Sequence, residues 1–192
     1  MTPAFPGTRD SGQASPLYIF VVASLLFLAL AFFAVGQAGA TRNGAQSAAD
    51  AAALAAAREQ RDSFDLTIDD LDDLLNGVLI PGGSGCGASQ GYAGQNGADV
   101  TGCAPLYDGR WGSTVSVSSQ KPVGDTILPG TDNLTASAQA TAIVVPRCSF
   151  EPTEDADSPS PGSLDCEGDV TDLDPTLLPD MSDLFDVRLA ED

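Results

Sequence analysis

One serine of this chain stands in a pattern that is typical of a catalytic nucleophile. Residues 87–91 read GASQG, the Gly-x-Ser-x-Gly form that presents the reactive serine of α/β-hydrolases between a strand and a helix. Ser89 would need a general base to take its proton, and histidine is the usual one. The chain has no histidine and no strand pattern just before residue 87. We therefore interpret the match as coincidental and expect that the chain is not an enzyme.

A cluster of aspartates raises the question of a calcium site. Residues 69–73 read DDLDD, and calcium prefers oxygen ligands such as carboxylates. The cluster lacks the glycine turn and the terminal glutamate of an EF-hand loop. Apolar residues of the surrounding segment recur at helical spacing: Leu66, Leu71, Leu74, Leu75 and Val78. They predict a short amphipathic helix that ends at Gly77 or Pro81, with the aspartates on its solvated face, so no metal or cofactor is expected.

Four cysteines fall into two pairs of similar spacing. They lack the Cys-x-x-Cys or Cys/His clusters of a zinc site, and four cysteines allow three pairings. We favour Cys86 with Cys103 and Cys148 with Cys166, because this pairing closes two short loops. Each bridge would stabilise the fold by about 3 kcal/mol, and it would indicate an oxidising compartment. Free thiols are the alternative.

The chain is strongly acidic, with 8 basic and 27 acidic residues and a formal net charge of -19. This charge excludes nucleic acid as a partner, because phosphate binding requires a basic face. Residues 151–192 contain 14 of the acids and one arginine, which predicts a solvated and poorly ordered tail. Its leucines suggest a last short helix, capped by Asp180 or Ser182, that docks onto the protein's own sheet or onto a partner.

Residues 17–35 form a continuous apolar run without a charge. As a helix the run would be about 28 Å long, close to the hydrocarbon thickness of a bilayer. Pro16 suits the first turn of such a helix, and Tyr18 suits the lipid–water interface. We predict a spanning helix. Since the cysteine pairs favour an oxidising side, the N-terminus is expected inside and the C-terminal part outside the cytoplasm.

A cleaved secretory signal is the alternative interpretation of this run. Residues 38–40 read AGA, the small-x-small form that precedes signal cleavage. A cut after Ala40 would give a secreted acidic cell-surface protein that could bind cations.

An alanine-rich arm follows the apolar run, and residues 44–57 read GAQSAADAAALAAA. Alanine has the best intrinsic helix propensity, so we expect one continuous helix through Gln60, about 66 Å long from residue 17. Small residues recur at every fourth position, as in close transmembrane helix pairs: Gly36, Ala40, Gly44, Ala48, Ala52 and Ala56. We expect the arm to pack closely against another helix or against the chain's own C-terminal sheet.

Residues 11–57, SGQASPLYIFVVASLLFLALAFFAVGQAGATRNGAQSAADAAALAAA, resemble the N-terminal module of Tad-type (tight adherence) Flp pilus-assembly proteins of the TadE/TadG-like kind. Residues 48–57 carry the most specific part of this resemblance, and the composition resembles that of actinobacterial relatives. The resemblance implies a pilin-like structural or assembly component of a bacterial pilus or related secretion system. It would be held in the cytoplasmic membrane and would contact the bilayer, itself or other Tad assembly proteins.

The resemblance also implies a processing site, since a prepilin peptidase would cut between Gly12 and Gln13. Pilins usually carry a glutamate five residues after the cut, where this chain has Leu17. A retained anchor that assists assembly therefore fits better than a major pilin.

The remaining chain predicts a small β-domain. Residues 82–102 are glycine-rich and are expected to form a loop, whereas 111–120 and 134–145 alternate apolar and small polar residues as strands of a hairpin do. Trp111 is the expected packing anchor. The predicted fold class is α+β: a long N-terminal helix followed by a small pilin-like antiparallel β-domain with two disulfides. The predicted parts are a cytoplasmic arm (1–16), a transmembrane helix (17–36), a helical extension (37–62), an outer α+β domain (63–150) and an acidic tail (151–192).

Overall fold

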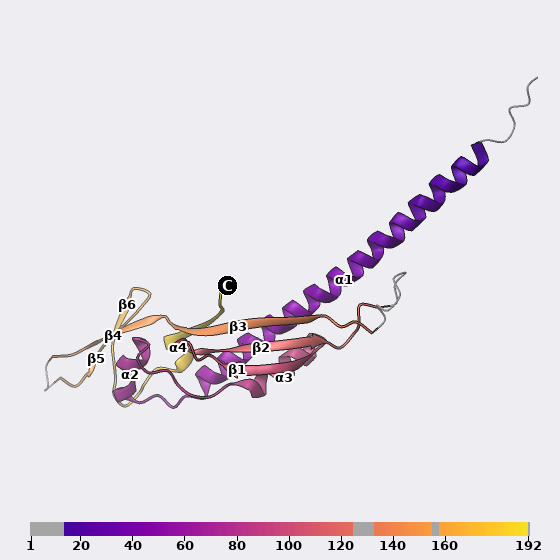
Figure 1. Cartoon of the computed structure of the whole chain (residues 1–192). Helices are drawn as coiled ribbons and strands as arrows, with labels where there is room; N and C mark the ends of the chain where they lie inside the picture. Colours follow the sequence, from indigo (N-terminus) through magenta and orange to yellow (C-terminus); the bar gives the residue numbers. More distant parts are fainter. Residues whose placement is uncertain (1–13, 125–132, 155–157, 192) are drawn as a thin grey trace, which may run out of the picture.

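The computed structural model describes residues 14–124, 133–154 and 158–191, with the backbone alone for residues 14 and 15. Helix α1 (Ala14–Asp62) runs unbroken over 49 residues, about 73 Å. The prediction of one continuous helix is confirmed, and the glycines at 36, 39 and 44 do not interrupt it. Its N-terminal half projects away from the rest of the chain, and its C-terminal half lies behind a sheet (Figure 1).

That sheet has four antiparallel strands in the order β1-β2-β3-β7. The strands are β1 (Ala98–Pro105), β2 (Gly112–Ser119), β3 (Ser137–Pro146) and β7 (Phe185–Leu189). Strands β2 and β3 pair from Gly112 with Ile143 to Ser118 with Ser137, so the hairpin predicted from alternation is confirmed. Every second residue of β2 is buried, Val115 and Val117 completely.

The alanine arm covers this sheet. Ala48, Ala52 and Ala56 are fully buried, and together with the β2 valines and Ala142 of β3 they belong to one apolar core. Methyl side chains keep the helix backbone close to the sheet, where larger side chains would hold the two layers apart. Of the two packing partners expected for the arm, the structure places these alanines against the chain's own sheet.

Two short helices follow the arm along the chain. Helix α2 (Ile68–Leu75) buries Leu71, Leu74 and Leu75, as the leucine spacing predicted. Helix α3 (Cys86–Gln95) and strand β1 replace the glycine-rich loop expected over residues 82–102, so that prediction was wrong. Tertiary contacts hold α3: the backbone N–H of Ala88 donates to the Glu59 carboxylate at 2.5 Å, and Cys86 is bridged to β1.

Gly85, which precedes α3, brings this segment against α1. Its φ of +54° is left-handed, a conformation that favours glycine. A Cβ at this position would overlap the backbone carbonyl of Ala56. Nearby, the Gln60 side-chain amide donates to the carbonyl of Gly83, and its Oε1 accepts from the Ser113 hydroxyl at 3.0 Å. Small residues on both sides therefore permit this contact.

The segment expected to be a poorly ordered tail contributes ordered structure, so that expectation was also wrong over residues 158–191. A second antiparallel sheet contains β4 (Cys148–Pro152), β5 (Gly162–Cys166) and β6 (Asp169–Asp172). Helix α4 (Met181–Leu184) follows, preceded by Asp180, whose side chain makes no capping hydrogen bond. Strand β7 then pairs with β3, which places the docking segment of the hypothesis on the protein's own sheet.

We call the second half of α1, the two sheets and the short helices the outer domain, after their position beyond the apolar run of α1. Trp111 anchors this domain, as expected. It is 7% exposed, and its ring meets Phe64 and Phe185 edge-on at centroid distances of 6.5 and 5.3 Å. The three rings come from the segment after α1, the residue just before β2 and the start of β7. They join parts of the chain that are far apart in sequence. The α+β fold class is confirmed.

Candidate functional site

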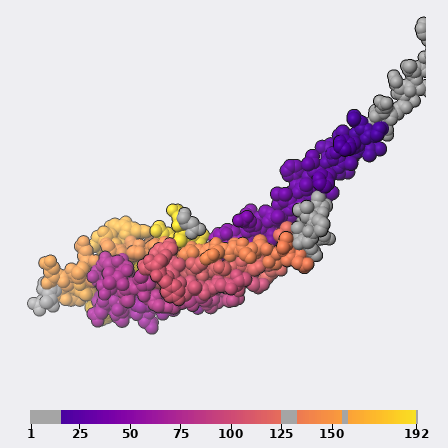
Figure 2. Space-filling view, in the orientation of Figure 1, coloured from indigo at the N-terminus to yellow at the C-terminus, as the bar shows by residue number. Residues whose placement is uncertain are grey.

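The N-terminal half of α1 presents an apolar surface to its surroundings. Its large side chains are exposed, and Phe20 and Phe32 reach 73% and 74%. The helix is long and apolar enough to cross a membrane. The stretch protrudes from the rest of the domain in the space-filling view (Figure 2). Such a surface is stable in lipid, which has no water to be ordered around it.

The row of small residues on α1 does not lie on one face of the helix. An α-helix turns by about 100° per residue, so each step of four residues advances the row by about 40°. From Gly36 to Ala52 the row has turned by about 160°. Accordingly, Gly36, Ala40 and Gly44 are exposed, whereas Ala48, Ala52 and Ala56 are buried against the sheet. The predicted packing row is thus divided into an exposed part and a part that is buried against the sheet.

The exposed part of the row points away from the chain's own domain. On the domain side of α1, Ala34 and Ala45 are 6% and 1% exposed. Gly36 lies about 160° around the helix from Ala34, and Ala40 lies about 40° from Gly36. Ala29, which the four-residue spacing missed, is within about 20° of Gly36 and is also exposed. Counting residues at seven-residue spacing would have found it.

We call Ala29, Gly36 and Ala40 the free small face. Small residues at such positions let two helix backbones approach closely, with Ala29 inside the apolar run and Gly36 and Ala40 at its C-terminal end. The next charged residue along α1 is Arg42, which is exposed just beyond the apolar run. C-terminal to Arg42 the helix meets the sheet, where Gln46 Nε2 lies 2.9 Å from Asp50 Oδ1 and 3.4 Å from the carbonyl oxygen of Gln139. The free small face therefore ends where the outer domain begins.

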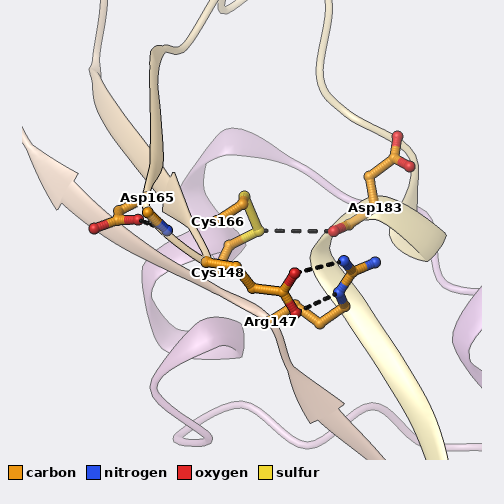
Figure 3. A network of polar contacts seen from close by, with 7 residues as sticks. Arg147, Cys148, Asp165, Cys166 and Asp183 are labelled. Carbon is orange, nitrogen blue, oxygen red and sulfur yellow. Dashed lines mark hydrogen bonds and ion pairs between the residues drawn. A yellow bond between two sulfur atoms is a disulfide. The ribbon is translucent and has the colours of Figure 1, made fainter.

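Two disulfides secure the outer domain, and both predicted pairings are confirmed. Cys86–Cys103 ties α3 to β1 with a Cα–Cα distance of 5.9 Å. Cys148–Cys166 joins directly opposite residues of β4 and β5 at 4.1 Å. The Sγ of Cys148 lies 3.7 Å from the carbonyl oxygen of Asp183 (Figure 3). A bridged sulfur carries no hydrogen, so this is a packing contact between the small sheet and α4.

An ion pair lies beside the second disulfide. The Arg147 guanidinium donates to both carboxylate oxygens of Glu167, at 3.0 and 3.3 Å (Figure 3). These hydrogen bonds lower the pKa of Glu167 and raise the pKa of Arg147. Asp108 likewise accepts from Arg110, which lowers the pKa of the Asp108 carboxyl. All these carboxylates are exposed to solvent, so the two ion pairs fix the local arrangement of their side chains and contribute little to the stability of the fold.

The residues considered for chemistry form no catalytic arrangement in the described part of the chain. Ser89 is fully buried, and its hydroxyl donates to the carbonyl of Cys86 at 2.8 Å instead of facing a cleft. The aspartates of residues 69–73 lie on α2. Within residues 14–124, 133–154 and 158–191, no group of three or more Cys, Asp or Glu side chains is arranged to hold a metal ion. The predicted processing site, Gly12 and Gln13, lies outside the described residues.

Comparison with known proteins finds a family match that covers most of the long helix α1. Residues 12–59 match the family described as putative Flp pilus-assembly TadE/G-like, which confirms the resemblance found in the sequence. The match spans the apolar run and the alanine arm, and residues 60–192 lie outside it. No curated protein and no solved structure matches the chain significantly. The chain therefore carries a pilus-assembly family segment on a helix that can span a membrane.

Proposed function

We propose that the chain is a membrane-anchored, pilin-like structural component of a Tad-type pilus or related secretion system, and that it has no enzymatic activity. The observation that carries the proposal is the division of α1. Its first half exposes an apolar surface with a free small face, and its second half is buried in the outer domain. The match of residues 12–59 to the pilus-assembly family supports this role.

The free small face is the proposed contact with other helices. In lipid, helices associate through close packing and not through the hydrophobic effect, because lipid tails are as apolar as the side chains. Residues with little or no side chain allow this packing at low entropic cost. The face points away from the outer domain, so a partner helix could approach it without displacing the sheet. The proposed partner is another assembly membrane protein or a second copy of α1.

The proposed orientation has the N-terminus inside the cytoplasm and the domain outside. Two disulfides in an outer domain of this size fit an oxidising compartment, since the cytoplasm keeps most thiols reduced. The alternative, a secreted acidic protein cut after Ala40, would divide α1 within its helical run. Intact mass of the protein purified from native membranes separates these cases: loss of residues 1–40 supports secretion, and loss of residues 1–12 supports prepilin-type processing.

The helix contact is tested with two substitutions of equal bulk. Ala40→Leu blocks the free small face, whereas Ala38→Leu adds the same side chain about 160° away on the same helical turn. We expect that only Ala40→Leu reduces helix association in liposomes, which is measured by energy transfer between labelled chains. In native membranes, only Ala40→Leu should reduce the amount of pilus-assembly protein that is recovered with the chain. Both variants should retain the emission spectrum of Trp111, which shows that the outer domain is folded. Equal association by both variants would contradict the proposed face.

A further inference from the structure

The end of the outer domain farthest from the apolar run carries a cavity that the proposed membrane role does not use. It has a volume of about 440 Å³ and lies between the β5–β6 sheet and the segment that leads into α4. Its buried apolar lining comes from Leu164, Leu173 and Leu184, which are at most 6% exposed. The small sheet lies at the end of the molecule opposite the projecting half of α1 (Figure 1).

The strand register turns one face of the small sheet toward the cavity. Leu164 of β5 pairs with Thr171 of β6, and Cys166 pairs with Asp169, so all four side chains lie on one face of the small sheet. That face lines the cavity. On the opposite wall, Leu177 is 76% exposed, although a leucine of a folded chain is more often buried. Leu177 therefore continues the leucine lining of the cavity onto the exposed surface.

Carboxylates surround this apolar surface. The acidic lining residues are Asp169, Asp172, Asp174 and Asp183. No lysine or arginine lines the cavity among the described residues. Arg147 is close enough to Asp183 for the two charges to interact, but its guanidinium is bound to Glu167. The rim is therefore negative around an apolar centre.

The charge selects among possible occupants. A second copy of this chain would bring a formal charge of -19 to an already negative rim, and anionic lipid headgroups would be repelled in the same way. A cavity of this size accepts one or two large apolar side chains. Lysine or arginine next to them would form charge-assisted contacts with the aspartates. Strand β6 is also an edge strand, paired with β5 alone in the described structure, which leaves room for an extended peptide beside it.

We propose that this cavity binds a segment of a partner protein in which a large apolar side chain is flanked by lysine or arginine. The inference goes beyond the membrane helix contact, because it assigns a second interaction surface at the other end of the molecule. Leu177 and the lining leucines hold the apolar side chain, and the aspartates select the basic neighbours. The two surfaces can therefore be tested separately.

The test is site-specific photocrosslinking of the full chain in its native host. Leu177→benzoylphenylalanine places the reactive group at the cavity, and Tyr107→benzoylphenylalanine places it on the β1–β2 connection, where Tyr107 is 89% exposed. We expect the cavity position alone to yield a crosslink that mass spectrometry maps to an apolar residue beside lysine or arginine. Adding Asp169→Asn and Asp172→Asn should lower the yield about fivefold, because each rim charge contributes modestly.

A charge-matched control accompanies this test. Asp99→Asn with Glu191→Gln removes the same charge from β1 and from the second residue after β7, both outside the cavity, and should leave the yield unchanged. A crosslink mapped to an acidic or uncharged segment, to lipid or to a second copy of this chain would overturn the proposal. So would the absence of a protein crosslink from Leu177, or a yield that falls equally in the control pair. None of these results would affect the Ala40→Leu experiment, so the two proposals can fail independently.

Discussion

Substituting Ala52 by leucine tests whether close contact between α1 and its sheet stabilises the outer domain. Ala52 is fully buried in the helix–sheet core, so three additional carbon atoms have no free space. Overpacking of this kind costs about 1–3 kcal/mol. At about 4 °C per kcal/mol for a domain of this size, the melting temperature should fall by about 4–12 °C. The helix itself should tolerate the change, because leucine has nearly the helix propensity of alanine.

Trp111 provides the assay for this prediction. It is the only tryptophan and is buried between Phe64 and Phe185, so its fluorescence reports on the outer domain even when α1 stays helical in detergent micelles. Ser47→Leu is the control: Ser47 is exposed on α1, and the same side chain there should change stability by less than about 0.5 kcal/mol. If Ala52→Leu melts at the same temperature as Ser47→Leu, close helix–sheet packing does not explain the alanine arm.

Three further predictions concern the outer domain. Gly85→Ala should destabilise it by about 2–4 kcal/mol in a denaturant titration, because the added methyl overlaps the α1 backbone and strains a left-handed residue; a change below about 0.5 kcal/mol would refute this contact. Replacing Cys86 and Cys103 by serine should cost about 3 kcal/mol, since the bridge closes a loop with a sequence separation of 17; equal stability with and without the bridge would contradict this. An NMR titration should find the pKa of the Glu167 carboxyl below that of a free glutamate, and Arg147→Gln should raise it. The stabilisation from this lowered pKa is present above the pKa of the unfolded chain and is lost as the pH falls through the folded value, so unchanged titration in the variant would refute the pairing.

The parts of the fold that could be predicted are those with a local physical cause. A charge-free apolar run and an alanine arm each favour helix by composition, and α1 follows both. The alternation of β2 and β3 reflects burial of one face, so their pairing was predictable from sequence. In contrast, the glycines of α3 favour a loop, and the helix forms because the Glu59 carboxylate and the Cys86 bridge hold it from outside the segment. No local pattern contains those contacts.

The acidic composition of the C-terminal region predicted a poorly ordered tail, although the alternation of its last residues favours a strand. Between residues 185 and 189, Phe185, Val187 and Leu189 alternate with Asp186 and Arg188, which is the pattern of a strand with one buried face. Phe185 is 1% exposed against Trp111, so the strand is held by its apolar face despite the surrounding charge. The candidate site was also predictable only in part. The small residues of α1 can be recognised in the sequence, but the structure is needed to see which of them face the sheet and which are exposed.

The burial of the alanine arm also determines how the molecule would carry force. Helix α1 runs lengthwise behind the strands (Figure 1), so a pull on its projecting half acts along the helix–sheet contact. Load in that direction is a shear, which strains the contacts of Ala48, Ala52 and Ala56 together instead of opening them one after another. Tension would reach the sheet through many small contacts at once, a mechanical property that suits the proposed subunit, held at one end by a membrane and at the other by a partner.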